Sequence, residues 1–145
     1  MKRFFAAIAS ILLFAGCDRY TNYDYRMDSD WVYVNESSYN LKLISNSEEY
    51  DRNETFELPI GASHTVELRQ FSTTTNLKAS DYQSPYYHFE VAIKIDGQKF
   101  ILDSDCAFVN AANYRSEQLG TNYYKFTYIF TDEIVEHITE VSKAQ

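Results

Sequence analysis

The nucleophilic and imidazole side chains of this 145-residue chain are few and widely spaced. There are two cysteines, Cys17 and Cys106, and three histidines, His64, His88 and His137, which lie on different expected elements. The sequence contains no G-x-S-x-G, H-E-x-x-H or C-x-x-C motif and no glycine-rich phosphate loop. We therefore expect the histidines on surfaces or strand faces, assign no catalytic residue, and expect that the chain is not an enzyme.

Two pairs of aspartates have the D-x-D spacing that can bring hard oxygen ligands together. They are Asp28/Asp30 and Asp103/Asp105. Calcium takes about six to eight oxygen ligands, often from loops of this kind. The EF-hand spacing fails after the second pair, where Cys106 follows. We expect solvated loop carboxylates, no metal site and no cofactor.

Cys17 has the most specific chemical context in the chain. It follows a basic start, residues 1–3 (MKR), a short apolar run from Phe4 to Ala15 and a glycine. A helix that spans a bilayer needs about 20 apolar residues, so this run is too short to span one. Its length matches the core of a signal peptide. The segment 13–17 (LFAGC) resembles a lipobox, in which the cysteine becomes the lipidated N-terminus. Residues 1–16 are predicted to be a lipoprotein signal peptide.

Two alternatives to lipidation stay open at this point. Ordinary secretory cleavage prefers small residues at the last and third-last positions before the cut, where Phe14 or Leu13 would stand third-last. A retained helix would need a longer apolar segment. Lipidation of Cys17 predicts a membrane anchor. Each buried CH₂ contributes roughly 0.8 kcal/mol to membrane binding, and two acyl chains give stable attachment.

The composition excludes one class of partner. The net charge is −8, from 13 basic and 21 acidic residues, and loss of Lys2 and Arg3 with the signal peptide makes the chain more acidic still. Affinity for nucleic acid rests largely on basic contacts to phosphate, so nucleic-acid binding is not expected. With Cys17 acylated, Cys106 has no cysteine to pair with, and its apolar neighbours at 107–109 predict burial.

The rest of the chain has the pattern of β-strands. A polar stretch at 18–30 predicts a tether, and alternation with many aromatic residues begins at Trp31. The dipeptide Asp96-Gly97 is typical of a tight hairpin turn. Strands are expected at 31–34, 39–45, 54–58, 64–71, 86–96, 99–103 and 123–131.

The C-terminus changes to helical spacing. Ile134, Ile138 and Val141 recur at positions that share one helix face, and Thr131 precedes them as a candidate cap. The sequence therefore predicts a mainly β chain: one Ig-like antiparallel β-sandwich of about seven strands at 31–141, with a short C-terminal helix.

Tyrosines near the expected loops are the candidates for ligand contact. The longest polar stretch, 72–85, predicts a surface loop, and long loops often carry binding residues. A tyrosine ring is amphipathic, so an exposed one can stack on a sugar. The candidates are Tyr82, Tyr86, Tyr114 and Tyr123. The alternative is that these tyrosines fill and edge the sandwich.

Three segments carry a resemblance to a known group of proteins. They are 31–37 (WVYVNES), 56–61 (FELPIG) and 128–133 (YIFTDE). Together with the lipobox and the polar tether, they resemble the small lipoproteins of Bacteroidota, a family of unknown function with one Ig-like β-sandwich. The resemblance implies an outer-membrane protein anchored through Cys17, and the face of the membrane stays open.

The functional expectation follows from the anchor, the sandwich and the motifs. It is a non-enzymatic module that binds a partner protein or a glycan at the cell envelope. The alternatives are a structural accessory subunit of an envelope or adhesive assembly, and a hydrolase with a dispersed site.

Overall fold

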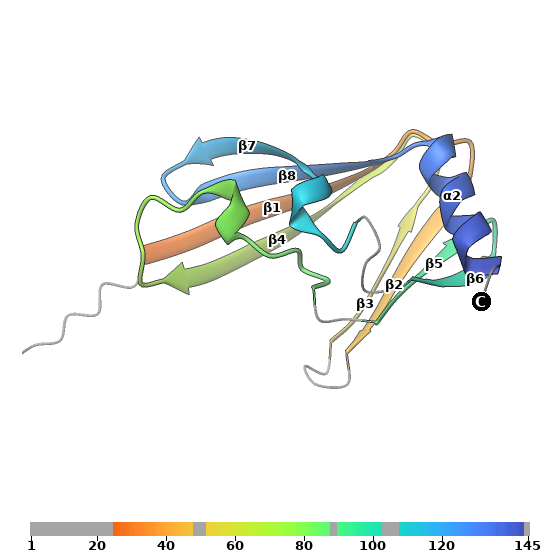
Figure 1. Cartoon of the computed structure of the whole chain (residues 1–145), viewed down its shortest axis with the longest axis horizontal. Coiled ribbons are helices and arrows are strands. Elements are labelled where there is room, and N and C mark those ends of the chain that lie inside the picture. The colour runs from red at the N-terminus through yellow and green to blue at the C-terminus, as the bar shows by residue number, and fades with distance from the viewer. Residues whose placement is uncertain (1–24, 48–51, 88–89, 103–107, 144–145) are drawn as a thin grey trace, which may run out of the picture.

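Two four-stranded sheets and a C-terminal helix make up the fold (Figure 1). The computed structural model describes residues 25–47, 52–87, 90–102 and 108–143. Sheet A has the strand order β4-β1-β8-β7, and sheet B has the order β3-β2-β5-β6. The strands are β1 (Tyr25–Asn35), β2 (Leu41–Ser47), β3 (Arg52–Leu58), β4 (Ser63–Ser72), β5 (Glu90–Ile95), β6 (Gln98–Leu102), β7 (Arg115–Gly120) and β8 (Tyr123–Phe130).

The predicted fold class, a mainly β sandwich with a short C-terminal helix, is confirmed. Two details differ from the prediction. The described chain has eight strands rather than about seven, and the pair β1–β8 is parallel while the other pairs are antiparallel. The additional strand is β7, which escapes prediction because all of its residues are exposed and no apolar alternation marks it.

Strand limits also differ from the prediction at three places. β1 begins at Tyr25, so residues 25–30 belong to sheet A and not to the predicted tether. The tether was predicted from the polar composition of this segment. That composition is compatible with a strand because alternate residues of β1, Asp28 and Asp30, point to the outer face of the sheet. The predicted loop 46–53 is partly strand, since β2 and β3 extend into it. β5 begins at Glu90 instead of Tyr86.

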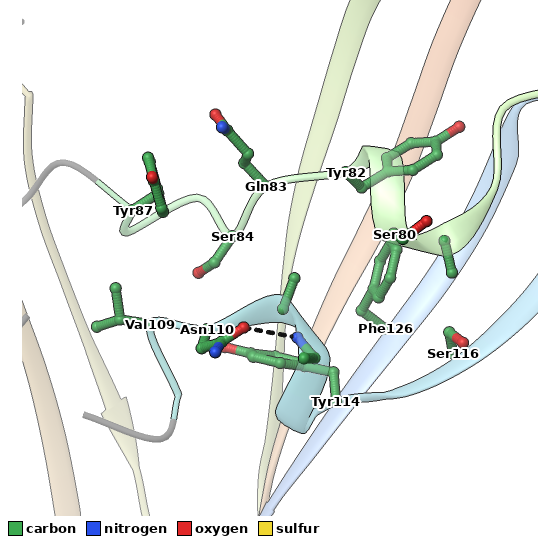
Figure 2. Close-up of a pocket in the computed structure, with 13 residues that line it drawn as sticks. Ser80, Tyr82, Gln83, Ser84, Tyr87, Val109, Asn110, Tyr114, Ser116 and Phe126 are labelled. Carbon is green, nitrogen blue, oxygen red and sulfur yellow. Dashed lines mark hydrogen bonds between the residues drawn. The ribbon is translucent and has the colours of Figure 1, made fainter. Parts of the chain in front are cut away.

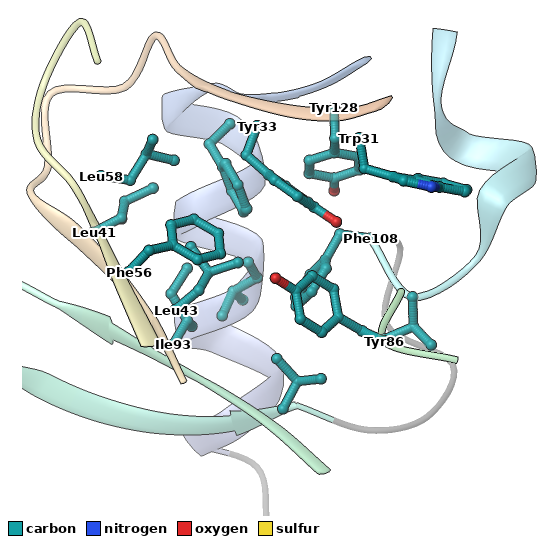
Figure 3. Packing of buried hydrophobic residues seen from close by; sticks show 14 of the residues in the cluster. Trp31, Tyr33, Leu41, Leu43, Phe56, Leu58, Tyr86, Ile93, Phe108 and Tyr128 are labelled. Atoms are coloured by element: carbon teal, nitrogen blue, oxygen red, sulfur yellow. The ribbon is translucent and has the colours of Figure 1, made fainter. Parts of the chain in front are cut away.

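Aromatic side chains fill the space between the sheets (Figure 3). Trp31 is fully buried and stacks on Phe126, with ring centroids 4.2 Å apart. Tyr114 meets Trp31 edge-on at 5.0 Å. The predicted alternation is confirmed in β2 and β8, because alternate residues of both strands are buried: Leu41, Leu43, Phe126, Tyr128 and Phe130.

Asn35 ties the end of β1 to its surroundings. Its side chain is fully buried, and its amide nitrogen donates to the carbonyl oxygens of Tyr39 and Leu58, each at 2.8 Å. Its amide oxygen accepts from the backbone amide of Ser37 at 3.0 Å and from the Ser37 hydroxyl at 2.7 Å. One polar side chain therefore joins the β1–β2 turn to the end of β3.

The helix α2 (Asp132–Lys143) begins where the sequence predicts, directly after Thr131. The Thr131 hydroxyl accepts from the backbone amide of Ile134 at 3.4 Å, as a cap should. The buried face differs slightly from the prediction: Val135 and Ile138 are buried, whereas Val141 is exposed. The helix thus covers the sandwich with its first half.

The carboxylate of Asp132 connects α2 to the β1–β2 turn. It accepts from the backbone amide of Ser38 at 2.6 Å and from the Ser38 hydroxyl at 2.7 Å. These hydrogen bonds, the backbone one first, hold the pKa of Asp132 below its usual value. A carboxylate with a lowered pKa in the folded state stabilises the fold above its unfolded pKa, and this contribution is lost as the pH falls through the folded pKa.

Asp132→Ala is expected to lower the melting temperature at neutral pH. The difference from the wild type should be complete above about pH 4, the usual aspartate pKa, and should vanish as the pH falls through the lowered pKa. Thermal melts of both proteins across this range measure it. Glu133→Ala, which removes a neighbouring carboxylate of the same helical turn, is the control and should show a smaller difference. A difference independent of pH would contradict the role of the carboxylate.

Candidate functional site

A cleft of about 720 Å³ lies along the inner face of sheet A. One wall runs from the short helix η1 (Ala79–Asp81) to Tyr87, and the other runs from Val109 through the short helix η2 (Ala111–Asn113). In Figure 1, sheet A extends beyond sheet B, and η1 and η2 lie along that extension. A volume of this size falls in the range of small-molecule sites.

Local hydrogen bonds shape both walls of the cleft. In the first wall, the backbone amide of Lys78 donates to the Asp81 carboxylate at 2.7 Å, and the backbone amide of Tyr87 donates to the Ser84 carbonyl at 3.1 Å. In the second wall, the Asn110 side chain accepts from the backbone amide of Ala112 at 2.9 Å (Figure 2). Such turns explain how segments without strand pairing keep a defined shape.

The floor of the cleft is aromatic and held in place. Phe126 comes from β8, and Tyr82 packs against it with ring centroids 5.5 Å apart. The Tyr114 hydroxyl donates to the Phe108 carbonyl and lies 3.3 Å from the Tyr33 hydroxyl. Because these rings also pack into the core, the floor has little freedom to collapse or rotate.

The rim of the cleft is polar and partly aromatic. Tyr87 is 50% exposed, and Gln83 beside it is also exposed. Figure 2 shows the Ser84 side chain pointing toward the opposite wall. The described lining residues are Ala79, Ser80, Tyr82, Gln83, Ser84, Tyr87, Val109, Asn110, Ala111, Ala112, Tyr114, Ser116 and Phe126.

The described lining of the cleft is uncharged at physiological pH. Its polar groups are hydroxyls and side-chain amides. Burial raises the pKa of Tyr82 to about 12, so its hydroxyl keeps its proton. The cleft thus offers neutral donors, neutral acceptors and ring surface within a chain whose net charge is −8.

The four tyrosines proposed from the sequence have different places. Tyr82 and Tyr114 line the cleft, but both are buried members of the core, as the alternative for these tyrosines expects. Tyr86 is buried in the core, as the alternative for these tyrosines expects. Tyr123 lies on the outer face of sheet A, where its hydroxyl donates to Asp30. Tyr87 was missed, because the sequence placed it within an expected strand, 86–96, whereas β5 begins only at Glu90.

The structure does not bring the described histidines together at the cleft. His64 lies on β4, where its ring stacks on Phe56 at 4.0 Å, and His137 is exposed on α2. Neither lines the cleft. The remaining candidates lie outside the described residues: Cys17, His88, Asp103, Asp105 and Cys106.

The first D-x-D pair is engaged by arginines. Asp28 pairs with Arg26 at 3.1 Å, and Asp30 pairs with Arg69 at 2.9 Å. The hydrogen bond from Tyr123 to Asp30 raises the pKa of Tyr123. Within the described residues, no group of three or more potential metal-ligating side chains occurs. These carboxylates therefore take part in ion pairs on the sheet surface.

Comparisons with known proteins place the chain in no established group. No protein-family model, no curated protein and no solved structure matches it. Among the residues that the structure describes, no helix combines the length and the apolarity that crossing a bilayer requires.

Proposed function

We propose that this protein is a lipid-anchored, non-enzymatic module of the cell envelope that binds a neutral glycan in the cleft between η1 and η2. The observation that carries the proposal is the lining of the cleft, which combines aromatic rings with neutral hydrogen-bonding side chains and no charged residue among those described. The anchor rests on the sequence around Cys17.

The chemistry of sugars fits this lining. A pyranose ring presents C–H groups on its faces, which pack on aromatic rings, and hydroxyls at its edge, which need donors and acceptors. Tyr87 offers a half-exposed ring at the rim, while Gln83 and Ser116 offer exposed polar groups. An ionic ligand would find no opposite charge among these residues, so a neutral saccharide is the better match.

Tyr87→Ala is expected to weaken glycan binding about tenfold, which corresponds to about 1.4 kcal/mol. The reason is the loss of the exposed ring on which a sugar face would stack. A glycan array identifies the ligand, and calorimetry with that ligand measures the dissociation constant. Tyr25→Ala, which removes a partly exposed tyrosine outside the cleft, is the control and should bind as the wild type does.

The pH dependence provides a second check on the same site. Because the described lining has no group that titrates near neutrality, affinity should stay constant between about pH 5 and pH 9.

Equal binding by Tyr87→Ala and the wild type would contradict the site. Absence of binding to any glycan would favour the structural accessory subunit instead.

Cys17→Ser is expected to leave the precursor unprocessed. The cysteine sulfur is the atom that carries the lipid in a lipoprotein, and a serine hydroxyl does not replace it. Mass spectrometry of the membrane fraction measures both the acyl mass on the wild type and the retained residues 1–16 on the variant. A variant that is cleaved and released at the wild-type rate would show ordinary secretion.

A further inference from the structure

Three large exposed apolar side chains lie toward one end of sheet A, on its strands β1, β4 and β7. They are Tyr25, Phe71 and Leu119, which are 40%, 72% and 45% exposed. β1 begins at this end, and Tyr25 pairs with Ser72 at the end of β4. β8 runs parallel to β1, so the β7–β8 turn beside Leu119 lies at the same end (Figure 1).

The opposite end of β1 lies beside the β3–β4 turn. There Asn35 accepts from the backbone amide of Gly61 at 2.9 Å, in the β3–β4 turn. Ile60 in that turn is an exposed apolar residue at 57%. A matched position at the far end of the same sheet is therefore available for comparison.

Hydrogen bonds hold the loops in place at the end of sheet A that carries Tyr25. Asn122, which is buried and has a positive φ of 52°, accepts from the backbone amide of Leu77 at 2.9 Å. Its side-chain nitrogen donates to the Thr74 carbonyl at 3.3 Å, and its own carbonyl accepts from the backbone amide of Asp28 at 2.9 Å. One residue thus holds the loop after β4, the β7–β8 turn and β1 together.

The charges near this end do not oppose a membrane surface. The nearest carboxylates on its strands, Asp28 and Glu117, are ion-paired with Arg26 at 3.1 Å and with Lys125 at 3.8 Å. The Arg26 side chain is largely exposed and lies opposite Phe71 in the strand register. Aromatic residues with a nearby cation are typical of the membrane–water interface.

The position of Cys17 in the sequence favours the membrane as the partner of this end of sheet A. Residues 18–24 join Cys17 to Tyr25, and a chain of that length reaches at most about 30 Å even when fully extended. A lipid on Cys17 therefore keeps the start of β1 close to the bilayer. A second copy of the chain or a separate protein has no comparable reason to meet this end.

We infer that this end of sheet A, with Tyr25, Phe71 and Leu119, docks onto the lipid headgroup region as a second membrane contact. The inference rests on the lipid anchor of the proposed function. Docking of the sheet end would orient the sandwich and direct Ile60 and the β3–β4 turn away from the bilayer.

The test uses the full acylated protein in vesicles of phosphatidylethanolamine and phosphatidylglycerol, with and without lipids brominated near the headgroup. Phe71→Trp and Ile60→Trp are compared, since both positions are exposed and lie at opposite ends of sheet A. Emission from Phe71→Trp should be blue-shifted and lose intensity with brominated lipid, whereas Ile60→Trp should change little. The native Trp31 is fully buried and contributes the same background to both variants.

The outcomes separate docking from anchoring. Acylated protein in which both variants respond alike to brominated lipid overturns the docking and leaves the anchor intact. Protein without acyl chains by mass spectrometry overturns the anchor and the docking together. Near-ultraviolet circular dichroism of the packed Trp31 shows that each variant has kept its fold.

Discussion

Asn35→Leu should lower the free energy of unfolding by about 3–5 kcal/mol. Leucine has a similar volume but no hydrogen-bonding atom. The carbonyls of Tyr39 and Leu58 and the amide of Ser37 would then lose their partners inside the protein. Each unsatisfied buried group costs about 1–3 kcal/mol.

Chemical denaturation measures this loss, and Asn40→Ala is its control. Asn40 is exposed, and it bonds to Asp96 through its backbone amide and carbonyl, so the change should stay within about 0.5 kcal/mol. Asn35→Asp should be at least as destabilising as Asn35→Leu at neutral pH, because it keeps the acceptor for Ser37 but buries a carboxylate that faces the carbonyl oxygens of Tyr39 and Leu58. A loss below about 1 kcal/mol in Asn35→Leu would mean that the turn rearranges and finds other partners.

Phe126→Ala is expected to lower the free energy of unfolding by about 3–5 kcal/mol through a different cause. The ring is almost fully buried, stacks on Trp31 at 4.2 Å and packs against Tyr82 at 5.5 Å. Alanine would remove these contacts and leave a cavity that the two flanking strands of sheet A hold open.

The control for this prediction is the same substitution at an exposed phenylalanine. Phe71→Ala should change the free energy of unfolding by no more than about 0.5 kcal/mol, because its ring is mostly in solvent. Equal losses at Phe71 and Phe126 would contradict the packing described here. Because Phe126 also forms the floor of the cleft, its removal should weaken glycan binding in the fraction that remains folded.

Several elements could be predicted because their signals are local. Alternation in β8 and the Asp96-Gly97 turn, where both residues have a positive φ, are encoded by adjacent residues. The start of α2 at Thr131 follows from a cap and a change of period. Each of these features depends on residues within a few positions of one another.

Other elements could not be predicted because their signals depend on distant partners. β7 is polar throughout and becomes a strand only by pairing with β8. Residues 25–30 have the composition of a tether, yet they pair with β4 along their whole length and, from Asp28 onward, with β8. In the sequence, Asn35 resembles an ordinary turn residue. It is buried because β3 and the β3–β4 turn pack against it.

The sequence by itself determined the class of fold, the helix start and the expectation of a lipidated Cys17, since each is encoded over a short stretch of chain. Only the tertiary structure decided which tyrosines line the cleft. Tyr82, Tyr87 and Tyr114 share a cleft because two segments far apart in the chain pack over the part of sheet A that extends beyond sheet B. Such convergence depends on long-range packing, which local periodicity does not encode.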